Sequence, residues 1–147
     1  MKIAIISPGK AHDSTVVEGI AEFEKRLPKK FSLQWLFPSA SDTDAEAKAI
    51  LKQLKDGDYV VLLDERGKDI NTPGLAAMLD THLGQGTKRL VFIIGGAYGV
   101  TDEVKARAQA IYKLSSLVFP HMLVRLILTE QLYRAATILD GGKYHHA

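Results

Sequence analysis

A run of apolar residues that leads directly into a glycine-rich segment is the feature that most constrains this fold. Leu90–Ile94 contains no polar residue, Gly95-Gly96-Ala97-Tyr98-Gly99 follows at once, and a helical pattern opens at Thr101. A short apolar run without alternation predicts a strand buried on both faces, as in a parallel sheet. The glycines let the backbone turn sharply and approach a ligand, at the strand end where open α/β sheets bind ligands.

The residues around this glycine segment indicate which ligands it suits. It matches neither G-x-G-x-x-G nor a glycine loop followed by Lys-Ser/Thr, the usual dinucleotide and triphosphate motifs. Asp102 and Glu103, in the first turn of the next helix, would repel a phosphate placed there. The segment therefore suits a neutral or cationic ligand, although a turn that needs glycine only for its geometry explains it equally well.

Strand and helix patterns alternate along the rest of the chain. Residues 31–37 alternate apolar and polar side chains, which predicts an edge strand, and Thr43 with Glu46 matches a capping box at a helix start. The full pattern places strands at 2–7, 31–37, 59–63, 90–94 and 114–119 and helices at 14–27, 43–54, 72–82, 102–112 and 122–139. It predicts an α/β fold, a mostly parallel sheet flanked by helices, in one domain over 1–147.

Composition limits the classes of function. The 147 residues include no cysteine, which excludes disulfides and thiolate chemistry. We expect no membrane span and no secretory signal, because no apolar stretch is long enough and Met1 leads straight into a strand pattern, so a cytoplasmic location is the default. The net charge of +2 permits nucleic-acid binding without arguing strongly for it.

Charged residues elsewhere carry weaker signals. Asp64 and Glu65 follow a strand but have no histidine nearby and stand beside Arg66 and Lys68, so we predict no metal site. The basic corner at 25–30 is interpreted as a solvated face, with contact to an RNA backbone as the alternative.

The C-terminal helix pattern at 122–139 is apolar over a wide surface, which predicts cover on more than one side, most simply by a second subunit. Glu130 and Arg134 are spaced for an ion pair on one helix face. Arg125 stands alone among apolar residues, so we expect its partner to be a carboxylate or a ligand phosphate.

Residues spread over essentially the whole chain match one family pattern in order and close to its spacing. They are Leu63-Asp64 with Gly67, Ile94-Gly95-Gly96 with Gly99, Leu114-Ser115, Pro120-His121, Leu123, Arg125, Leu128, Glu130-Gln131-Leu132-Tyr133-Arg134-Ala135 and Tyr144-His145. In these the chain resembles the large-subunit ribosomal RNA methyltransferase H family, within the SPOUT methyltransferases. The ending, His146-Ala147, departs from the family, whose members often end in an acid.

The resemblance implies a SPOUT-type fold with a C-terminal trefoil knot, assembled as a homodimer. It implies S-adenosyl-L-methionine (S-adenosylmethionine) as the methyl donor. The implied reaction is methylation at N3 of a pseudouridine in 23S ribosomal RNA on the assembled ribosome, with no membrane and no DNA as partners.

The resemblance also implies roles for individual residues. Those that would line the methyl-donor pocket are Leu63, Gly95, Gly96, Gly99, Leu114, Ser115, Ser116, Leu117, Val118 and Phe119. His145 or His121 would accept the N3 proton, or Arg125 or Arg134 would stabilise the anion. Substrate contacts would come from Glu130, Tyr133, Arg134, Tyr144 and His145. The alternatives are that His145 only orders the tail and that Tyr133 and Arg134 pack in a dimer interface.

Three other functions stay open from the sequence. One is a SPOUT methyltransferase with another RNA target, because the donor pocket would be shared. Another is a nucleotide-binding or receiver-like module, although Ser7-Pro8-Gly9-Lys10 after the first strand offers no acidic cluster. The third is a non-catalytic ribosome assembly factor that keeps the fold without the activity.

Overall fold

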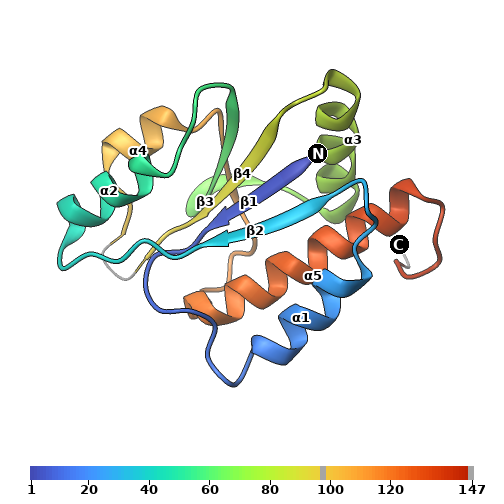
Figure 1. Cartoon of the computed structure of the whole chain (residues 1–147), viewed down its shortest axis with the longest axis horizontal. Helices are drawn as coiled ribbons and strands as arrows, with labels where there is room; N and C mark the ends of the chain where they lie inside the picture. The colour runs from blue at the N-terminus through green and yellow to red at the C-terminus, as the bar shows by residue number, and fades with distance from the viewer. Residues whose placement is uncertain (97–98, 146–147) are drawn as a thin grey trace.

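Five parallel strands form the central sheet, in the order β2-β1-β4-β3-β5 (Figure 1). The computed structural model describes residues 1–96 and 99–145, so Ala97 and Tyr98 of the glycine segment and His146 and Ala147 of the tail lie outside it. The strands are β1 Lys2–Ile6, β2 Ser32–Leu36, β3 Asp58–Asp69, β4 Arg89–Ile94 and β5 Ala110–Lys113. The parallel sheet and the edge position of β2 confirm the predictions.

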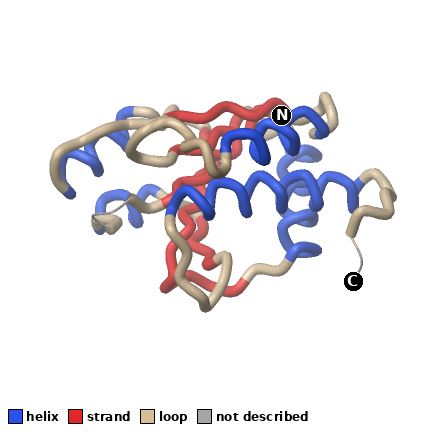
Figure 2. The backbone as a smooth tube through the Cα atoms, turned by 90° about the horizontal axis from the view of Figure 1, so that it is seen from below, coloured by secondary structure: helices blue, strands red, loops and turns tan. Residues whose placement is uncertain are grey.

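Helices cover both faces of this sheet. They are α1 Val17–Arg26, α2 Thr43–Lys52, α3 Thr72–Gln85, α4 Asp102–Arg107 and α5 His121–Leu139. One apolar core joins β1, β3 and β4 to α3 and α5, with α1 beside α5, and the second core joins the opposite strand faces to α2 and α4 (Figures 1 and 2). No helix in the described ranges is long and apolar enough to cross a membrane.

Much of the apolar surface of α5 is buried by other elements of the same chain. It packs against α1, α3 and β4, and Leu128 and Leu132 are fully buried. The breadth of its apolar surface is therefore explained largely without a second subunit, and the predicted homodimer needs other support.

The predicted strand at 114–119 is wrong, because β5 occupies Ala110–Lys113 and the helix before it ends early at Arg107. The side chain of Gln109 accepts a hydrogen bond from the backbone N–H of Val60 at 2.8 Å and draws the chain toward β3. Beyond Lys113, Ser115 Oγ accepts a hydrogen bond from Leu117 N–H at 2.9 Å, which favours a turn over a strand. Residues 114–120 therefore form a loop.

The charged segment after Leu63 was expected to be a loop, but β3 continues through it to Asp69 with a register shift between Leu63 and Lys68. Gly67 makes this possible, because a Cβ there would lie 2.6 Å from the carbonyl carbon of Tyr112. Only glycine permits so close an approach of the two backbones. The strand order places β5 outside β3, and the trefoil knot itself stays a prediction.

The start of α2 differs from the predicted capping box. Asp42 is the N-cap residue, and its carboxylate accepts a hydrogen bond from Ala45 N–H at 2.8 Å. Asp and Thr are both good N-cap residues, so the local sequence does not decide between neighbours. The consequence is that Glu46 does not close a capping box, and its side chain is buried against the glycine loop.

Candidate functional site

A cavity of about 430 Å³ opens at the carboxyl end of β4, beside the part of β3 where the register shifts after Leu63. Its walls come from these two strands, the glycine loop, the 114–119 loop and the start of α5. Every residue predicted to line the methyl-donor pocket lies on this cavity except Ser116, whose hydroxyl accepts a hydrogen bond from Lys113 Nζ at 3.2 Å. The structure thus brings together residues from three distant segments, while their role in binding a donor stays a prediction.

The glycine loop fits tightly into this wall. A Cβ on Gly95 would lie 3.1 Å from Val100 Cγ2, and a Cβ on Gly96 would lie 2.5 Å from Glu46 Oε1. Gly99 has a φ of +80°, a conformation that favours glycine. Gly99 N–H also donates to Gly96 O at 3.2 Å, which closes the loop on itself. The glycines therefore serve the loop geometry and also bring main-chain polar groups to the cavity surface.

The rest of the cavity surface is mixed in chemistry. Leu63, Ile94 and Phe119 supply apolar wall, while acidic and basic side chains, including Asp64 and Lys105, stand at its edge. Asp64 Oδ1 accepts a hydrogen bond from Arg66 N–H at 2.9 Å and so holds the local turn. No group of three or more potential metal-ligating side chains occurs within 1–96 and 99–145. Such a surface suits an organic ligand with a flat apolar part and polar edges.

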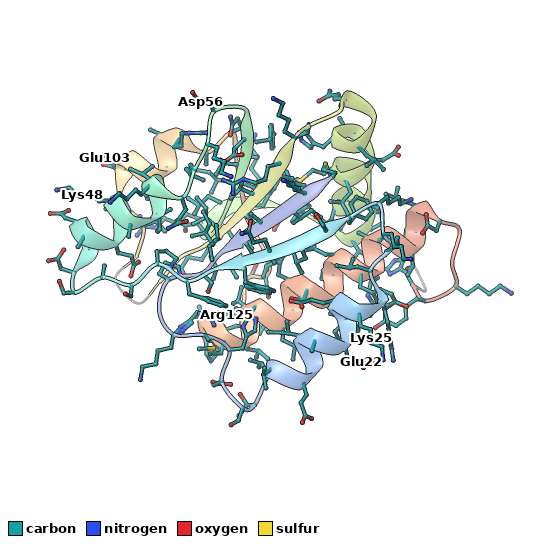
Figure 3. The ribbon with its side chains drawn as sticks, in the orientation of Figure 1. Glu22, Lys25, Lys48, Asp56, Glu103 and Arg125 are labelled. Atoms are coloured by element: carbon teal, nitrogen blue, oxygen red, sulfur yellow. The ribbon has the colours of Figure 1, made fainter. Side chains whose placement is uncertain are left out.

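Arg125 is fully buried on α5, where this helix faces the loop after β1 (Figure 3). Its Nε donates to Ser7 Oγ at 2.7 Å, its Nη1 lies 3.4 Å from His12 Nδ1, and its guanidinium carbon lies 4.7 Å from the centre of the Phe37 ring. The hydrogen-bond and ring partners that the described chain gives Arg125 are neutral, although the Asp13 carboxylate acts on its charge, and a ligand phosphate stays a prediction. Burial and the Arg125 charge both lower the pKa of His12, which keeps its ring neutral as an acceptor.

The other predicted polar residues gather near the C-terminal end of α5. Arg134 Nε donates to Glu130 Oε1 at 2.7 Å, which confirms the predicted pair. Tyr144 O–H donates to the same oxygen at 3.2 Å, and its ring lies under the Arg134 guanidinium and 4.8 Å from the Tyr133 ring. Hydrogen bonding to Glu130 raises the pKa of Arg134, which stabilises the charged form of the guanidinium. His145 follows, with a buried Nδ1 that has no hydrogen-bond partner in the described part of the chain.

The cavity and this polar cluster do not meet within one chain. His121 and Val124 of α5 line the cavity, whereas Tyr144 folds back on Glu130 and Arg134 toward the other end of the helix. The 19 residues of α5 span about 27 Å at 1.5 Å per residue. Figure 1 shows the segment after α5 turning back beside the end of this helix that lies away from the carboxyl end of β4. Of the predicted catalytic residues, only His121 lies on the cavity.

The sequence interpretation missed Ser7, His12 and Glu46 as parts of this region. Ser7 and His12 carry no local signal, because they are brought to Arg125 by the packing of α5 on the sheet. Glu46 had a usable signal. It stands on the same helix face as the apolar residues Ala47 and Ile50, and this spacing indicates that the face is buried.

Comparison with known proteins bears on the family of this chain. Residues 1–145 match the family described as Predicted SPOUT methyltransferase. The chain is 38% identical over 154 residues to the Ribosomal RNA large subunit methyltransferase H of Trichlorobacter lovleyi, covering 99% of this chain and 100% of the relative. It is 42% identical over 146 residues to the protein of the same name from a Synechococcus species, covering 99% and 95%.

A solved structure supports the same fold. A probable methylase family protein from Haemophilus influenzae superposes with a TM-score of 0.59 at 10% identity, over 95% of this chain and 66% of that one. At this identity the likeness concerns the fold alone. Together with the full-length relatives, it leads to one conclusion: this chain belongs to the ribosomal RNA large subunit methyltransferase H family of the SPOUT methyltransferases.

Proposed function

We propose that this protein is an S-adenosylmethionine-dependent methyltransferase that modifies N3 of a pseudouridine in 23S ribosomal RNA, acting in the cytoplasm as a homodimer on the assembled ribosome. One observation carries the proposal. The residues that the family resemblance assigns to the donor pocket converge on a single cavity at the carboxyl ends of the strands. Relatives similar over their whole length are named as methyltransferases of large-subunit ribosomal RNA.

The cavity has the properties that this methyl donor requires. Its volume of about 430 Å³ falls in the range of about 300–1,000 Å³ typical of small-molecule sites. Leu63, Ile94 and Phe119 suit the faces of an adenine ring, and the main-chain groups of Gly95 and Gly96 can read its polar edge. Two acids, Asp64 and Glu65, and two bases, Arg66 and Lys105, stand at the cavity edge, so its charges are balanced. When bound, the donor supplies an already activated methyl group.

Little further chemistry is then required of the protein. The cavity walls would hold the donor and the target base in line, which supplies much of the rate, and the apolar rim would exclude water. A group must also take the N3 proton as the methyl arrives. His145, with its unpartnered Nδ1, and His121, on the cavity wall, are the candidates for this base, and Arg134 for stabilising the anion. The burial of Arg125 favours a positioning role for it over contact with substrate.

The separation of cavity and tail supports the homodimer. Tyr144 is held on Glu130, about 14 Å along α5 from His121 on the cavity wall, so we propose that the tail of one copy completes the cavity of the other. Leu117 and Val118 are 72% and 80% exposed on the cavity rim, where a second copy would cover them. Each reaction centre would then contain residues of both chains.

The first test is calorimetric titration of the purified protein with S-adenosylmethionine, with ATP as the control ligand. Micromolar binding of the donor, roughly −8 kcal/mol, and no binding of ATP is the expected result. Binding of ATP instead would favour the nucleotide-binding module. Incubation of the donor-bound protein with ribosomes then tests the target, and ribosome binding without methyl transfer would favour the assembly factor.

A further inference from the structure

A buried carboxylate lies directly behind the glycine loop of the cavity. Glu46, in the first turn of α2, is only 5% exposed. A Cβ on Gly96 would lie 2.5 Å from its Oε1 and 2.8 Å from its Oε2, so the carboxylate touches the loop backbone with nothing between them. Gly96 itself lines the cavity, whereas Glu46 does not. A single residue of main chain therefore separates the carboxylate from the cavity.

One oxygen of this carboxylate lacks a partner. Glu46 Oε1 is shielded from solvent and has no hydrogen-bond partner within the described ranges. Burial raises the pKa of Glu46, and neighbouring charges do not counter that shift. Buried acids in folded proteins are normally paired or fully hydrogen-bonded, because an uncompensated one costs free energy. The described part of the fold supplies no partner for Glu46 Oε1, which points to the ligand as the group that this acid serves.

We infer that Glu46 is a specificity-determining positioning residue, whose carboxylate makes the cavity prefer a sulfonium ligand to the corresponding neutral thioether. The inference rests on the proposed function. The methyl donor carries a sulfonium charge that is lost when the methyl group leaves. A fixed negative charge behind Gly96 therefore holds the donor more tightly than the demethylated product, and it favours product release.

Glu46 is more deeply buried than the other acids near the cavity. Asp64 on the cavity wall is half-buried and accepts a hydrogen bond from Arg66 N–H, whereas Glu65, Asp102 and Glu103 are exposed to solvent, where water and salt screen their fields. A unit charge acting over about 10 Å at an effective dielectric constant near 20 changes an affinity by roughly tenfold. An exposed acid at the same distance has a much smaller effect.

The test compares two ligands on two variants. Glu46→Gln removes the charge and keeps the shape, and Glu103→Gln removes an exposed acid from neighbouring α4 (Figure 3). The affinities of S-adenosylmethionine and S-adenosylhomocysteine are measured by calorimetry for each protein. We expect Glu46→Gln to weaken the sulfonium ligand about tenfold and the thioether less than twofold. Glu103→Gln should leave the affinity ratio within twofold of wild type.

The outcomes separate the inference from its alternatives. An equal loss for both ligands in Glu46→Gln would mean that Glu46 only supports the loop, and an unchanged ratio would mean that its charge does not reach the cavity. Either result overturns the inference while the proposed function stands. Wild-type protein that binds neither ligand would instead refute the proposed function, and the inference with it.

Discussion

Replacing Gly67 with alanine should disturb the close approach of β3 and β5 beside the cavity. The new Cβ would lie 2.6 Å from the carbonyl carbon and 2.7 Å from the nitrogen of Tyr112, and 2.8 Å from the carbonyl carbon of Ile111. These separations are roughly 1 Å short of the distance at which carbon atoms pack. All three atoms belong to the main chain of a paired strand, so no side chain can rotate away.

The loss of stability in Gly67→Ala depends on how far the backbones of β3 and β5 must separate. Separating the backbones strains the pairing of Lys68 with Tyr112 and of Asp69 with Lys113. Overpacking of a dense interior costs about 1–3 kcal/mol, and we expect about 3 kcal/mol here because the contacts are rigid. Gly84→Ala in α3 is the matched control, since nothing lies within 4 Å of its Cβ position. As a helical position, it should gain about 0.5–1 kcal/mol.

Urea unfolding followed by circular dichroism measures both changes. Gly67→Ala should unfold at a clearly lower urea concentration and melt roughly 6–12 °C lower, and Gly84→Ala should unfold slightly higher than wild type. Donor affinity should also fall in Gly67→Ala, because β3 and the loop after β5 both form cavity wall. A Gly67→Ala protein within 0.5 kcal/mol of wild type, beside a control that behaves as expected, would refute the argument from close backbone approach.

Three further predictions test other parts of the molecule. A mixed dimer is made of one Ser115→Trp chain, whose cavity is blocked, and one His145→Ala chain, whose tail lacks the histidine. If each site combines the cavity of one chain with the tail of the other, one intact site remains, and methyl transfer to ribosomes should recover to about half of wild type. Absence of recovery would place the site in one chain. Because burial raises the pKa of Glu46, the free energy that its protonated form contributes is lost as the pH rises through that pKa, and Glu46→Gln should stabilise the protein more at pH 8 than at pH 4 in urea unfolding. Burial lowers the pKa of His12 and His82, so stability should fall as the pH drops below about 6.5; a flat profile between pH 7 and 5 would contradict this.

Much of the cavity could be predicted because its position depends on topology more than on exact boundaries. The sequence placed Leu63 and Gly95 at the ends of buried parallel strands, and the pairing of Leu63 with Ile94 does bring them to one edge of the sheet. The position of the cavity was therefore predicted correctly although the predicted end of β3 and the predicted start of β5 were wrong. The sequence pattern did not predict how deeply each cavity residue is buried, because burial depends on side chains from distant segments.

The 114–119 segment shows why local pattern fails there. Its apolar residues suggested a buried strand, yet Leu117 and Val118 are among the most exposed large apolar residues of the described chain. Apolar residues on a cavity rim and in a core look identical in sequence. The converse error occurred at 64–68, where a charged segment forms part of a strand because Gly67 lets it cross β5 closely. Tertiary packing overrode local propensity in both places.

The separation of the predicted catalytic residues along α5 follows in part from the rise per residue of an α-helix. His121 and Arg134 belong to one helix, so they lie about 20 Å apart along its axis and cannot both touch one reacting atom in the same chain. The sequence therefore already required either a site shared between chains or a catalytic role for only one of the two. It left open whether the tail returns along α5 to the cavity. The hydrogen bond from Tyr144 to Glu130 holds the tail beside the second half of α5, about 14 Å along the axis from His121, which is why the proposed site takes the tail of one copy to the cavity of the other.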